Sequence, residues 1–421
     1  MIQTQTLFPG VTLRCIPDSR FKHGCLSLQL VRPMRAEEAA MNALLPAVLL
    51  RGCQSCPDLR AITLRLDDLY GAGVGALVRR VGDWQTTGFY CSFTEDRYAM
   101  SGDAILQPLT EFVGELLLEP LTENGCFRAD FVESEKKNLI STIDSQLNDK
   151  RAWAMDKLLR QMCRGDSFGI PRLGHKEDVA AITPQALWDH YHRILRESRV
   201  ELFYVGEAPA QQVAQYLRPI FEGLRREPVT LPPQSPFHDL GGDDFSHSLD
   251  VNQGKLCMGL ITPITTRDPR FVHMQLLNMV FGGGMTSKLF MHIRETLSLC
   301  YAIGSGYHSS KGIMTVSAGI DFEKEDQVRR EILAQLEACR RGDISEAELQ
   351  DAKQALCSTL YAIHDSPGSM ENYYASAALS GLPLTAEEYR EAALAATVSD
   401  LAAAAQTVKL HTVFFLKGVT A

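Results

Sequence analysis

Few side chains in this 421-residue sequence have the spacing of a metal or catalytic centre. Cys53 and Cys56 form a C-x-x-C pair, which is the spacing of half a zinc site or of a redox dithiol. No second pair completes it, so two ordinary thiols at a helix end are the favoured interpretation. His190 and His192 are two residues apart on a predicted helix and do not share a face. The sequence contains neither a G-x-x-x-x-G-K-[ST] phosphate loop nor a G-x-S-x-G nucleophile elbow.

The most distinctive pattern is the stretch 281–307, FGGGMTSKLFMHIRETLSLCYAIGSGY. Its three glycines at 282–284 predict a loop whose backbone takes dihedrals closed to other residues. Thr286 or Ser287 can cap a following helix by accepting a free N–H of its first turn. Apolar residues recur there at helical spacing, at Leu289, Phe290, Ile293 and Leu297. A strand is predicted after the helix.

Composition restricts the class of protein. A hydrophobic content of 45% and a charged content of 22% are ordinary for a globular chain long enough for two or three domains. The net charge of −9 argues against nucleic acid or an anionic membrane as a partner. We find no apolar run long enough to span a membrane and no signal peptide in MIQTQTLFPG. Eleven scattered cysteines fit reduced thiols, so we expect a cytoplasmic location.

The first half mixes strands and helices without a strict βαβ alternation. Strands are predicted at 11–16, 26–31, 88–93 and 200–205, and helices at 36–51, 58–70, 103–118, 127–148, 150–163 and 184–196. This pattern favours an α+β fold with a mainly antiparallel sheet of about six strands packed against helices.

The second half repeats the first. Strands are predicted at 256–264, 301–307, 312–320 and 413–418, and helices at 269–280, 323–341, 344–363, 368–380 and 385–406. RVELFYVGEAP at 199–209 matches HTVFFLKGVTA at 411–421, which indicates a tandem duplication with a period of about 210 residues. We therefore predict domains at 1–225 and 245–421, joined by a Pro-, Gly- and Asp-rich linker at 226–244. Two unrelated α+β domains are the alternative.

The stretch 281–307 resembles the C-terminal-half signature of the insulinase/pitrilysin (inverzincin) metallopeptidase family, in which a glycine-rich turn, a helix with Arg-Glu and a downstream Tyr recur in this order. The resemblance covers nearly the whole chain. It implies that Arg294 and Tyr301 correspond to the family's substrate-contacting pair. It also implies a substrate-guiding role for the glycine loop, which consists of Gly282, Gly283 and Gly284.

The resemblance places the family's zinc motif, H-x-x-E-H, at 42–53, NALLPAVLLRGC. In that motif two histidines on one helical face bind zinc, and the glutamate acts as general base on the bound water. Here Ala43 and Ala47 take the places of the histidines and Pro46 that of the glutamate. Methyl groups cannot bind zinc and proline cannot abstract a proton. Pro46 also predicts that the helix begins nearby or kinks.

The family's third zinc ligand is a glutamate on a later helix. In FVESEKKNLIST, Thr142 takes its place, and a hydroxyl is a poor zinc ligand beside a carboxylate. The nearby Glu133 and Glu135 are interpreted as part of a solvated helix face. LRLDDLYGAG at 64–73 supports the register, because it resembles the L-E-x-x-G-A turn that follows the motif in the family. The resemblance therefore implies no catalytic residue, no metal and no cofactor.

The substrate-contacting residues of the family are present and its zinc-binding residues are replaced. This combination implies a non-catalytic peptidase homologue. We expect it to pair in a clamshell with an active zinc-peptidase homologue, to which Arg294 and Tyr301 would be supplied in trans for peptide processing. A homodimeric peptide-binding or structural scaffold is the second hypothesis. The third is an active peptidase with a displaced metal site, for example around Cys53 and Cys56.

Overall fold

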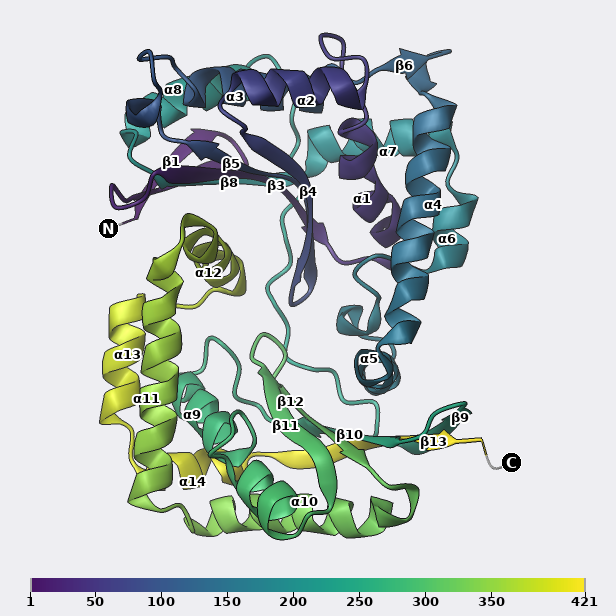
Figure 1. Cartoon of the computed structure of the whole chain (residues 1–421), viewed down its shortest axis with the longest axis vertical. Helices are drawn as coiled ribbons and strands as arrows, with labels where there is room; N and C mark the ends of the chain where they lie inside the picture. The colour runs from purple at the N-terminus through teal and green to yellow at the C-terminus, as the bar shows by residue number, and fades with distance from the viewer. Residues whose placement is uncertain (1, 420–421) are drawn as a thin grey trace. The chain divides into compact units, whose positions relative to one another are not determined.

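The computed structural model describes residues 2–419, apart from the side chain of Leu147. The chain divides into two compact units, each described here by itself (Figure 1). Unit 1 comprises Met1–Asp144, Ile170–Pro233 and His364–Ser376, and unit 2 comprises Ser145–Gly169, Gln234–Ile363 and Ala377–Ala421. Each unit thus includes a segment from the opposite half of the sequence. The sequential domain limits given above remain predictions.

Unit 1 is built on a mainly antiparallel sheet. In the described residues it has six strands in the order β1-β2-β8-β3-β5-β4, and only the β2/β8 pair is parallel. The strands are β1 (Gln3–Phe8), β2 (Val11–Pro17), β3 (His23–Pro33), β4 (Gly73–Val81), β5 (Trp84–Thr94) and β8 (Arg199–Gly206). A short hairpin of β6 (Thr122–Glu123) and β7 (Cys126–Phe127) lies outside this sheet.

Helices cover both faces of this sheet. The helices of the first half in unit 1 are α1 (Ala36–Leu49), α2 (Leu59–Asp68), α3 (Leu106–Leu118), α4 (Ala129–Ser145), α6 (Lys176–Ala181), α7 (Pro184–Glu197) and α8 (Ala210–Phe221). Figure 1 shows α2, α3 and α8 over one face and α12 (Pro367–Ser380) on the other. Along β3, the leucines at 26, 28 and 30 join the hydrophobic core, whereas Ser27 and Gln29 hydrogen-bond to Glu371 of α12. The strand is buried on both faces for this reason.

Unit 2 has a second mainly antiparallel sheet. Its five described strands have the order β11-β12-β10-β13-β9, and only the β13/β9 pair is parallel. They are β9 (Asp244–Leu249), β10 (Gly254–Ile261), β11 (Cys300–His308), β12 (Ile313–Ile320) and β13 (Lys409–Gly418). The helices are α5 (Lys150–Met162), α9 (Phe271–Phe281), η4 (Leu289–Thr296), α10 (Glu325–Arg341), α11 (Glu346–Ala362), α13 (Ala386–Ala395) and α14 (Val398–Gln406).

The two halves of the chain share one topology. The strand order β2-β8-β3-β5-β4 of the first half is repeated as β9-β13-β10-β12-β11 in the second. Helix α5 follows α4 as α12 follows α11, and these two corresponding helices are the ones exchanged between the units. The predicted α+β fold of two tandem homologous domains is confirmed.

Several details differ from the sequence-based expectation. The single helix predicted at 385–406 is wrong, because α13 ends at Ala395 and Thr397 starts α14 with a capping box to Asp400. Strands β1, β4 and β9 and helix α8 were not predicted. None of the helices within residues 2–419 combines the length and apolar character of a membrane-spanning segment.

Candidate functional site

The segment that corresponds to the zinc motif lies in α1. Because α1 runs from Ala36 to Leu49, the expectation that a helix begins near Pro46 is wrong; a kink at this residue remains a prediction. A proline at this position leaves the carbonyl of Asn42 without its usual helical N–H donor. The hydroxyl of Thr87 on β5 donates to that carbonyl at 2.6 Å. A neighbouring strand therefore supplies the hydrogen bond that the proline cannot make.

The three other positions that correspond to the family's zinc motif carry neither an imidazole nor a carboxylate. Ala43 is buried, and Ala47 is partly exposed. Thr142 is exposed on α4, and its hydroxyl donates to the carbonyl of Asn138 at 2.9 Å. In residues 2–419 we find no group of three or more His, Cys, Asp or Glu side chains placed to hold a metal ion.

The two glutamates near Thr142 are engaged by cations. Arg51, at the end of the motif segment, lies 3.4 Å from the carboxylate of Glu135. Glu133 pairs with Lys136 on its own helix at 2.8 Å. The exposed Glu133 agrees with a solvated helix face, whereas Glu135 is partly buried.

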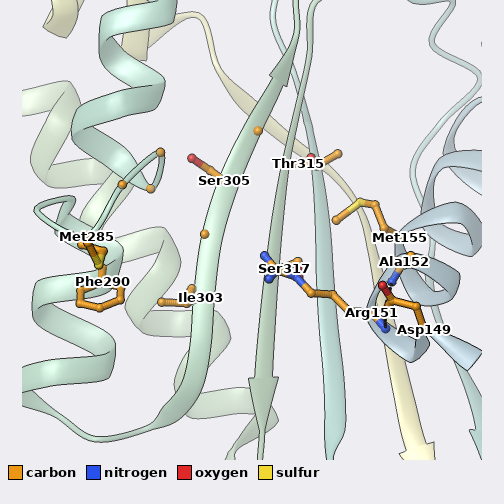
Figure 2. Close-up of a pocket in the computed structure, with 15 residues that line it drawn as sticks. Asp149, Arg151, Ala152, Met155, Met285, Phe290, Ile303, Ser305, Thr315 and Ser317 are labelled. Carbon is orange, nitrogen blue, oxygen red and sulfur yellow. Dashed lines mark hydrogen bonds between the residues drawn. The ribbon is translucent and has the colours of Figure 1, made fainter. Parts of the chain in front are cut away.

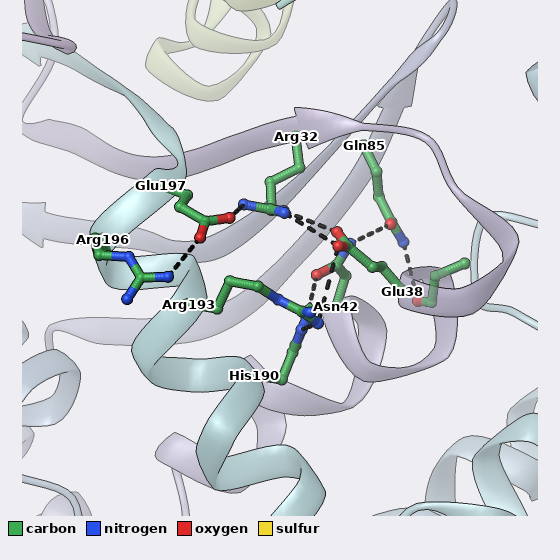
Figure 3. A network of polar contacts seen from close by, with 9 residues as sticks. Arg32, Glu38, Asn42, Gln85, His190, Arg193, Arg196 and Glu197 are labelled. Atoms are coloured by element: carbon green, nitrogen blue, oxygen red, sulfur yellow. Dashed lines mark hydrogen bonds and ion pairs between the residues drawn. The ribbon is translucent and has the colours of Figure 1, made fainter. Parts of the chain in front are cut away.

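A buried polar network surrounds the first turns of α1 (Figure 3). Arg32 on β3 donates to both carboxylate oxygens of Glu38, at 2.8 and 3.0 Å, and both side chains are buried. Burial opposes the ionisation of Glu38, but the hydrogen bonds and charge of Arg32 hold its pKa below the ordinary value. The amide of Asn42 donates to Gln85 on β5 at 2.8 Å and accepts from His190 on α7 at 2.7 Å. These contacts tie α1 to its neighbours.

His190 is the titratable group at the centre of this network. Its Nδ1 accepts from the guanidinium of Arg193 at 2.7 Å, so the proton that Asn42 accepts is on Nε2. Burial, with the positive charge of Arg193, lowers the pKa of His190 to about 4. Both ring nitrogens are occupied, so His190 is a neutral structural residue. His192 is exposed and packs edge-on against Trp188. Sequence reasoning did not single out this network, whose members become neighbours only in the fold.

Cys53 and Cys56 are two buried free thiols in a tight turn. Their backbones exchange hydrogen bonds of 2.8 and 3.2 Å, and both sulfurs contact the hydroxyl of Ser55. Burial raises the pKa of Cys56 above the ordinary value. The described chain brings no further ligand to the pair, so the arrangement does not form a metal centre.

The glycine loop forms one wall of a pocket of about 600 Å³ in unit 2 (Figure 2). The N–H groups of Gly282 and Gly283 donate to the carbonyl of Asn278 at the end of α9, at 3.0 and 2.8 Å. The carbonyl of Gly282 accepts from the N–H of Ser305 on the edge strand β11 at 2.8 Å. A Cβ on Gly282 would lie 2.7 Å from the Ser305 hydroxyl, so this approach requires a glycine.

The opposite wall is formed by α5, which the sequence did not place near the glycines. Asp149, Arg151, Ala152 and Met155 line the pocket from the start of this helix. The Nε of Arg151 donates to the hydroxyl of Ser317 on β12 at 2.9 Å. Arg151 belongs to the first half of the sequence, so no local signal pointed to its position in unit 2.

Arg294 and Tyr301 lie near the glycine loop in sequence but do not line the pocket. Helix η4 has π-helical hydrogen bonding, a form that is often found at functional sites. The Arg294 guanidinium lies 4.6 Å from the centre of the Phe290 ring and keeps 41% of its side chain exposed. Ser287 provides the predicted cap through a long hydrogen bond of 3.4 Å from the N–H of Phe290.

Tyr301 occupies a break in register between β11 and β12. It is 62% exposed, and its phenol donates to the carboxylate of Asp321 at 3.0 Å. This hydrogen bond, with the negative charge of Asp321, raises the pKa of Tyr301, so the phenol stays protonated at neutral pH. The structure thus presents both residues of the predicted pair to solvent, and their role in binding remains a prediction.

Comparisons with known proteins agree with this fold. Residues 181–356 match the family model described as the peptidase M16 inactive domain. The probable inactive metalloprotease YmfF of Bacillus subtilis is 27% identical over 97% of this chain and 96% of its own length. The uncharacterized zinc protease YmxG of the same bacterium is 24% identical over 66% of this chain and 67% of its own length.

Solved structures share the fold over the whole chain. A conserved protein from Enterococcus faecalis has a TM-score of 0.91 and 27% identity, with coverage of 100% of this chain and 99% of the other. A peptidase M16 inactive domain from Pseudomonas fluorescens has a TM-score of 0.81 and 17% identity with the same coverage. These matches confirm the predicted resemblance: the chain is similar to inactive homologues of the insulinase/pitrilysin-like metallopeptidase family.

Proposed function

We propose that this chain is the non-catalytic subunit of a peptide-processing pair and binds substrate for an active zinc-peptidase homologue. The observation that carries the proposal is the contrast between its two candidate sites. The motif segment on α1 carries methyl groups and a proline in place of ligands and base. The substrate side keeps an open pocket, a glycine loop against an edge strand and an exposed arginine and tyrosine.

The surroundings of Arg294 and Tyr301 support this role. Arg294 is held by a ring contact and by a 3.7 Å approach to Glu295, both of which a peptide carbonyl or carboxylate could replace at little cost. Tyr301 would exchange its hydrogen bond to Asp321 for one to a substrate. Exposed contacts of this kind contribute little to stability and leave the two side chains available.

The relatives support the pairing. Bacillus subtilis encodes one relative named as an inactive metalloprotease and another named as a zinc protease. A bacterium with both kinds of protein has the two members that such a pair requires. The active partner proposed here is the equivalent zinc-protease homologue, with an intact H-x-x-E-H motif.

The first experiment measures the isolated protein. We expect purified protein to hold far less than one zinc per chain by mass spectrometry and to cleave none of a mixture of unstructured peptides. Stoichiometric zinc together with peptide cleavage would refute a non-catalytic role and would favour a displaced metal site.

The second experiment mixes this chain with the active homologue. We expect a heterodimer on gel filtration and a higher rate of peptide cleavage than the homologue shows alone. The variants Arg294→Ala and Tyr301→Phe should retain the heterodimer and lose most of the gain. Arg330→Ala and Tyr361→Phe are matched controls, because both residues are exposed elsewhere on unit 2. A stable homodimer that forms no complex with the homologue would favour the scaffold hypothesis instead.

A further inference from the structure

Arg151 presents a positioned cation to the pocket of unit 2. Its Nε is fixed by the 2.9 Å hydrogen bond to Ser317. Among the described residues, Nη1 and Nη2 have no hydrogen-bond or ion-pair partner. Figure 2 shows the side chain extending from α5 across the pocket toward β12. A guanidinium held by one nitrogen, with two others free, is pre-organised to bind a planar anion.

The strand beneath this guanidinium has no side chains at the relevant positions. A Cβ on Gly304 would lie 3.9 Å from Nη2 of Arg151, so the guanidinium lies above a bare stretch of β11. A Cβ on Gly306 would have Thr315 as its nearest neighbour, at 3.5 Å. The two glycines leave this face of β11 without side chains, so a ligand can approach the strand backbone closely.

The charges along this wall favour an anion. Burial and the nearby charge of Arg151 lower the pKa of Lys255, whose ammonium donates to Gln253 and does not line the pocket. The acidic group of the wall, Asp149, accepts the N–H groups of Arg151 and Ala152 at 3.0 Å and caps α5. The charged residues that line the pocket are Arg151 and Asp149, and the carboxylate is already hydrogen-bonded to the helix, so the guanidinium is the charge available to a ligand.

The other end of the pocket is apolar. Met285, which is 75% exposed, lines it together with Phe290 and Ile303. The N–H of Ser305 points away from β12, because it donates to Gly282. Since backbone directions alternate along a strand, the amide of Ile303 faces the same outer edge. The pocket thus combines this main-chain amide with an apolar surface and a guanidinium.

We propose that this pocket binds the carboxylate of an extended peptide and that Arg151 is the residue that selects it. The carboxylate pairs with Nη1 and Nη2, and an apolar side chain of the peptide lies against Met285 and Phe290. A C-terminal carboxylate and a glutamate side chain share this chemistry. The inference rests on the proposed peptide-binding function and specifies its ligand class.

The test uses three fluorescein-labelled peptides and fluorescence anisotropy with the full chain. The first is Gly-Ala-Leu-Phe-Leu with a free C-terminal carboxylate, the second is its carboxamide, and the third is the carboxamide of Gly-Ala-Leu-Phe-Glu. We expect the carboxamide of the first sequence to bind about tenfold to a hundredfold more weakly than its acid. Tight binding of the glutamate peptide would identify a side-chain carboxylate as an equivalent ligand, and weak binding would identify the C-terminus.

Variants separate the role of Arg151 from general effects. Arg151→Gln should bind the acid as weakly as the carboxamide, and Arg151→Lys should recover part of the preference. Ser317→Ala should lower the preference without abolishing it, because Ser317 only positions the guanidinium. Arg330→Ala, at an exposed arginine on α10, is the control and should leave the preference unchanged.

Two results would overturn the inference. Equal affinity of the wild-type protein for the acid and the carboxamide would contradict selection of a carboxylate, although peptide binding itself would still be supported. No binding of any peptide would remove the pocket as the site. Stimulation of an active homologue is measured separately. It tests the proposed function even if the inference about the carboxylate is wrong.

Discussion

The two exchanged helices are anchored in opposite ways. In unit 1, α12 places Glu371, which is fully buried, against Ser27 and Gln29 at 2.6 and 2.9 Å and against both terminal nitrogens of Arg79 at 2.9 and 2.8 Å. In unit 2, α5 packs on its sheet through a small apolar cluster of Trp153, Ala154, Leu158, Cys257, Phe414 and Leu416. The same topological element has a buried charged anchor in one unit, beside buried apolar residues such as Met370, and an apolar anchor in the other.

The difference shows how one duplicated fold can divide its tasks. In unit 1 the carboxylate of Glu371 and the ring of His190 are buried, and their polar atoms have protein hydrogen-bond partners. In unit 2 the apolar cluster holds α5, so the charge of Arg151 is not needed for anchoring and remains open to a ligand. Sealed polar groups stabilise a fold, whereas open ones on a rigid support can bind.

The largest expected effect is the loss of the buried carboxylate of Glu371. The variant Glu371→Ala leaves Arg79 without its partner and leaves two buried donors, on Ser27 and Gln29, unsatisfied. We expect the free energy of unfolding to fall by about 4 kcal/mol in urea titrations followed by circular dichroism. Glu391→Gln, at an exposed glutamate, should change it very little. A loss below about 1 kcal/mol would show that α12 is not anchored by charge.

The apolar anchor of α5 is tested by Leu158→Ala. Leu158 is fully buried in the small cluster that holds this helix, so the substitution removes apolar contacts and leaves a cavity. We expect a cost of about 3 kcal/mol in the same titration. Exposed Leu64 on α2 offers the matched Leu64→Ala control, which should cost far less. Equal costs for the two leucines would contradict the assigned anchor.

The sequence predicted the repeat, most strands and the glycine loop, because these depend on local patterns. It could not predict the exchange of α5 and α12, because nothing in the sequence around Glu371 or Arg151 indicates which sheet each helix packs against. The local rule for proline could not indicate that Thr87, on a distant strand, donates the hydrogen bond that Pro46 cannot make. For the candidate site the sequence indicated the glycines, whereas the opposite wall with Arg151 emerged only from the fold.

The buried network around His190 in unit 1 predicts that the free energy of unfolding depends on pH. The pKa of His190 is about 4 in the folded chain against an ordinary value of 6.5, so the unfolded chain binds this proton more readily. Above pH 6.5 His190 is neutral in both states, so the difference between its two pKa values does not change the free energy of unfolding. As the pH falls from 6.5 toward 4, the unfolded chain takes up the proton first and the folded state loses stability. We expect a loss of about 2 kcal/mol at pH 5, measured as the difference in pH dependence between wild type and His190→Gln.

The control and a competing group sharpen this measurement. His192→Gln, at the exposed histidine two residues further on, should keep the wild-type pH dependence. Burial raises the pKa of Glu95 to about 7, so its contribution to stability increases as the pH falls from 7 toward 4.5. The pH dependence of wild-type stability alone contains both effects, which have opposite signs. Its difference from that of His190→Gln gives the contribution of the histidine. Identical pH dependence in wild type and His190→Gln would contradict a sealed network.

The smallest effect on stability is expected at the open site. Tyr301→Phe removes only the exposed hydrogen bond to Asp321, which water can replace, so the urea midpoint should stay within the error of the wild-type value. If the proposed function holds, the same variant should lose most of the stimulation of the active homologue, because we propose that this phenol binds the substrate. An exposed binding residue of unit 2 is expected to affect function without affecting folding. If Tyr301→Phe destabilised the chain as Glu371→Ala does, Tyr301 would belong with the sealed groups, and its assignment to substrate binding would lose its physical basis.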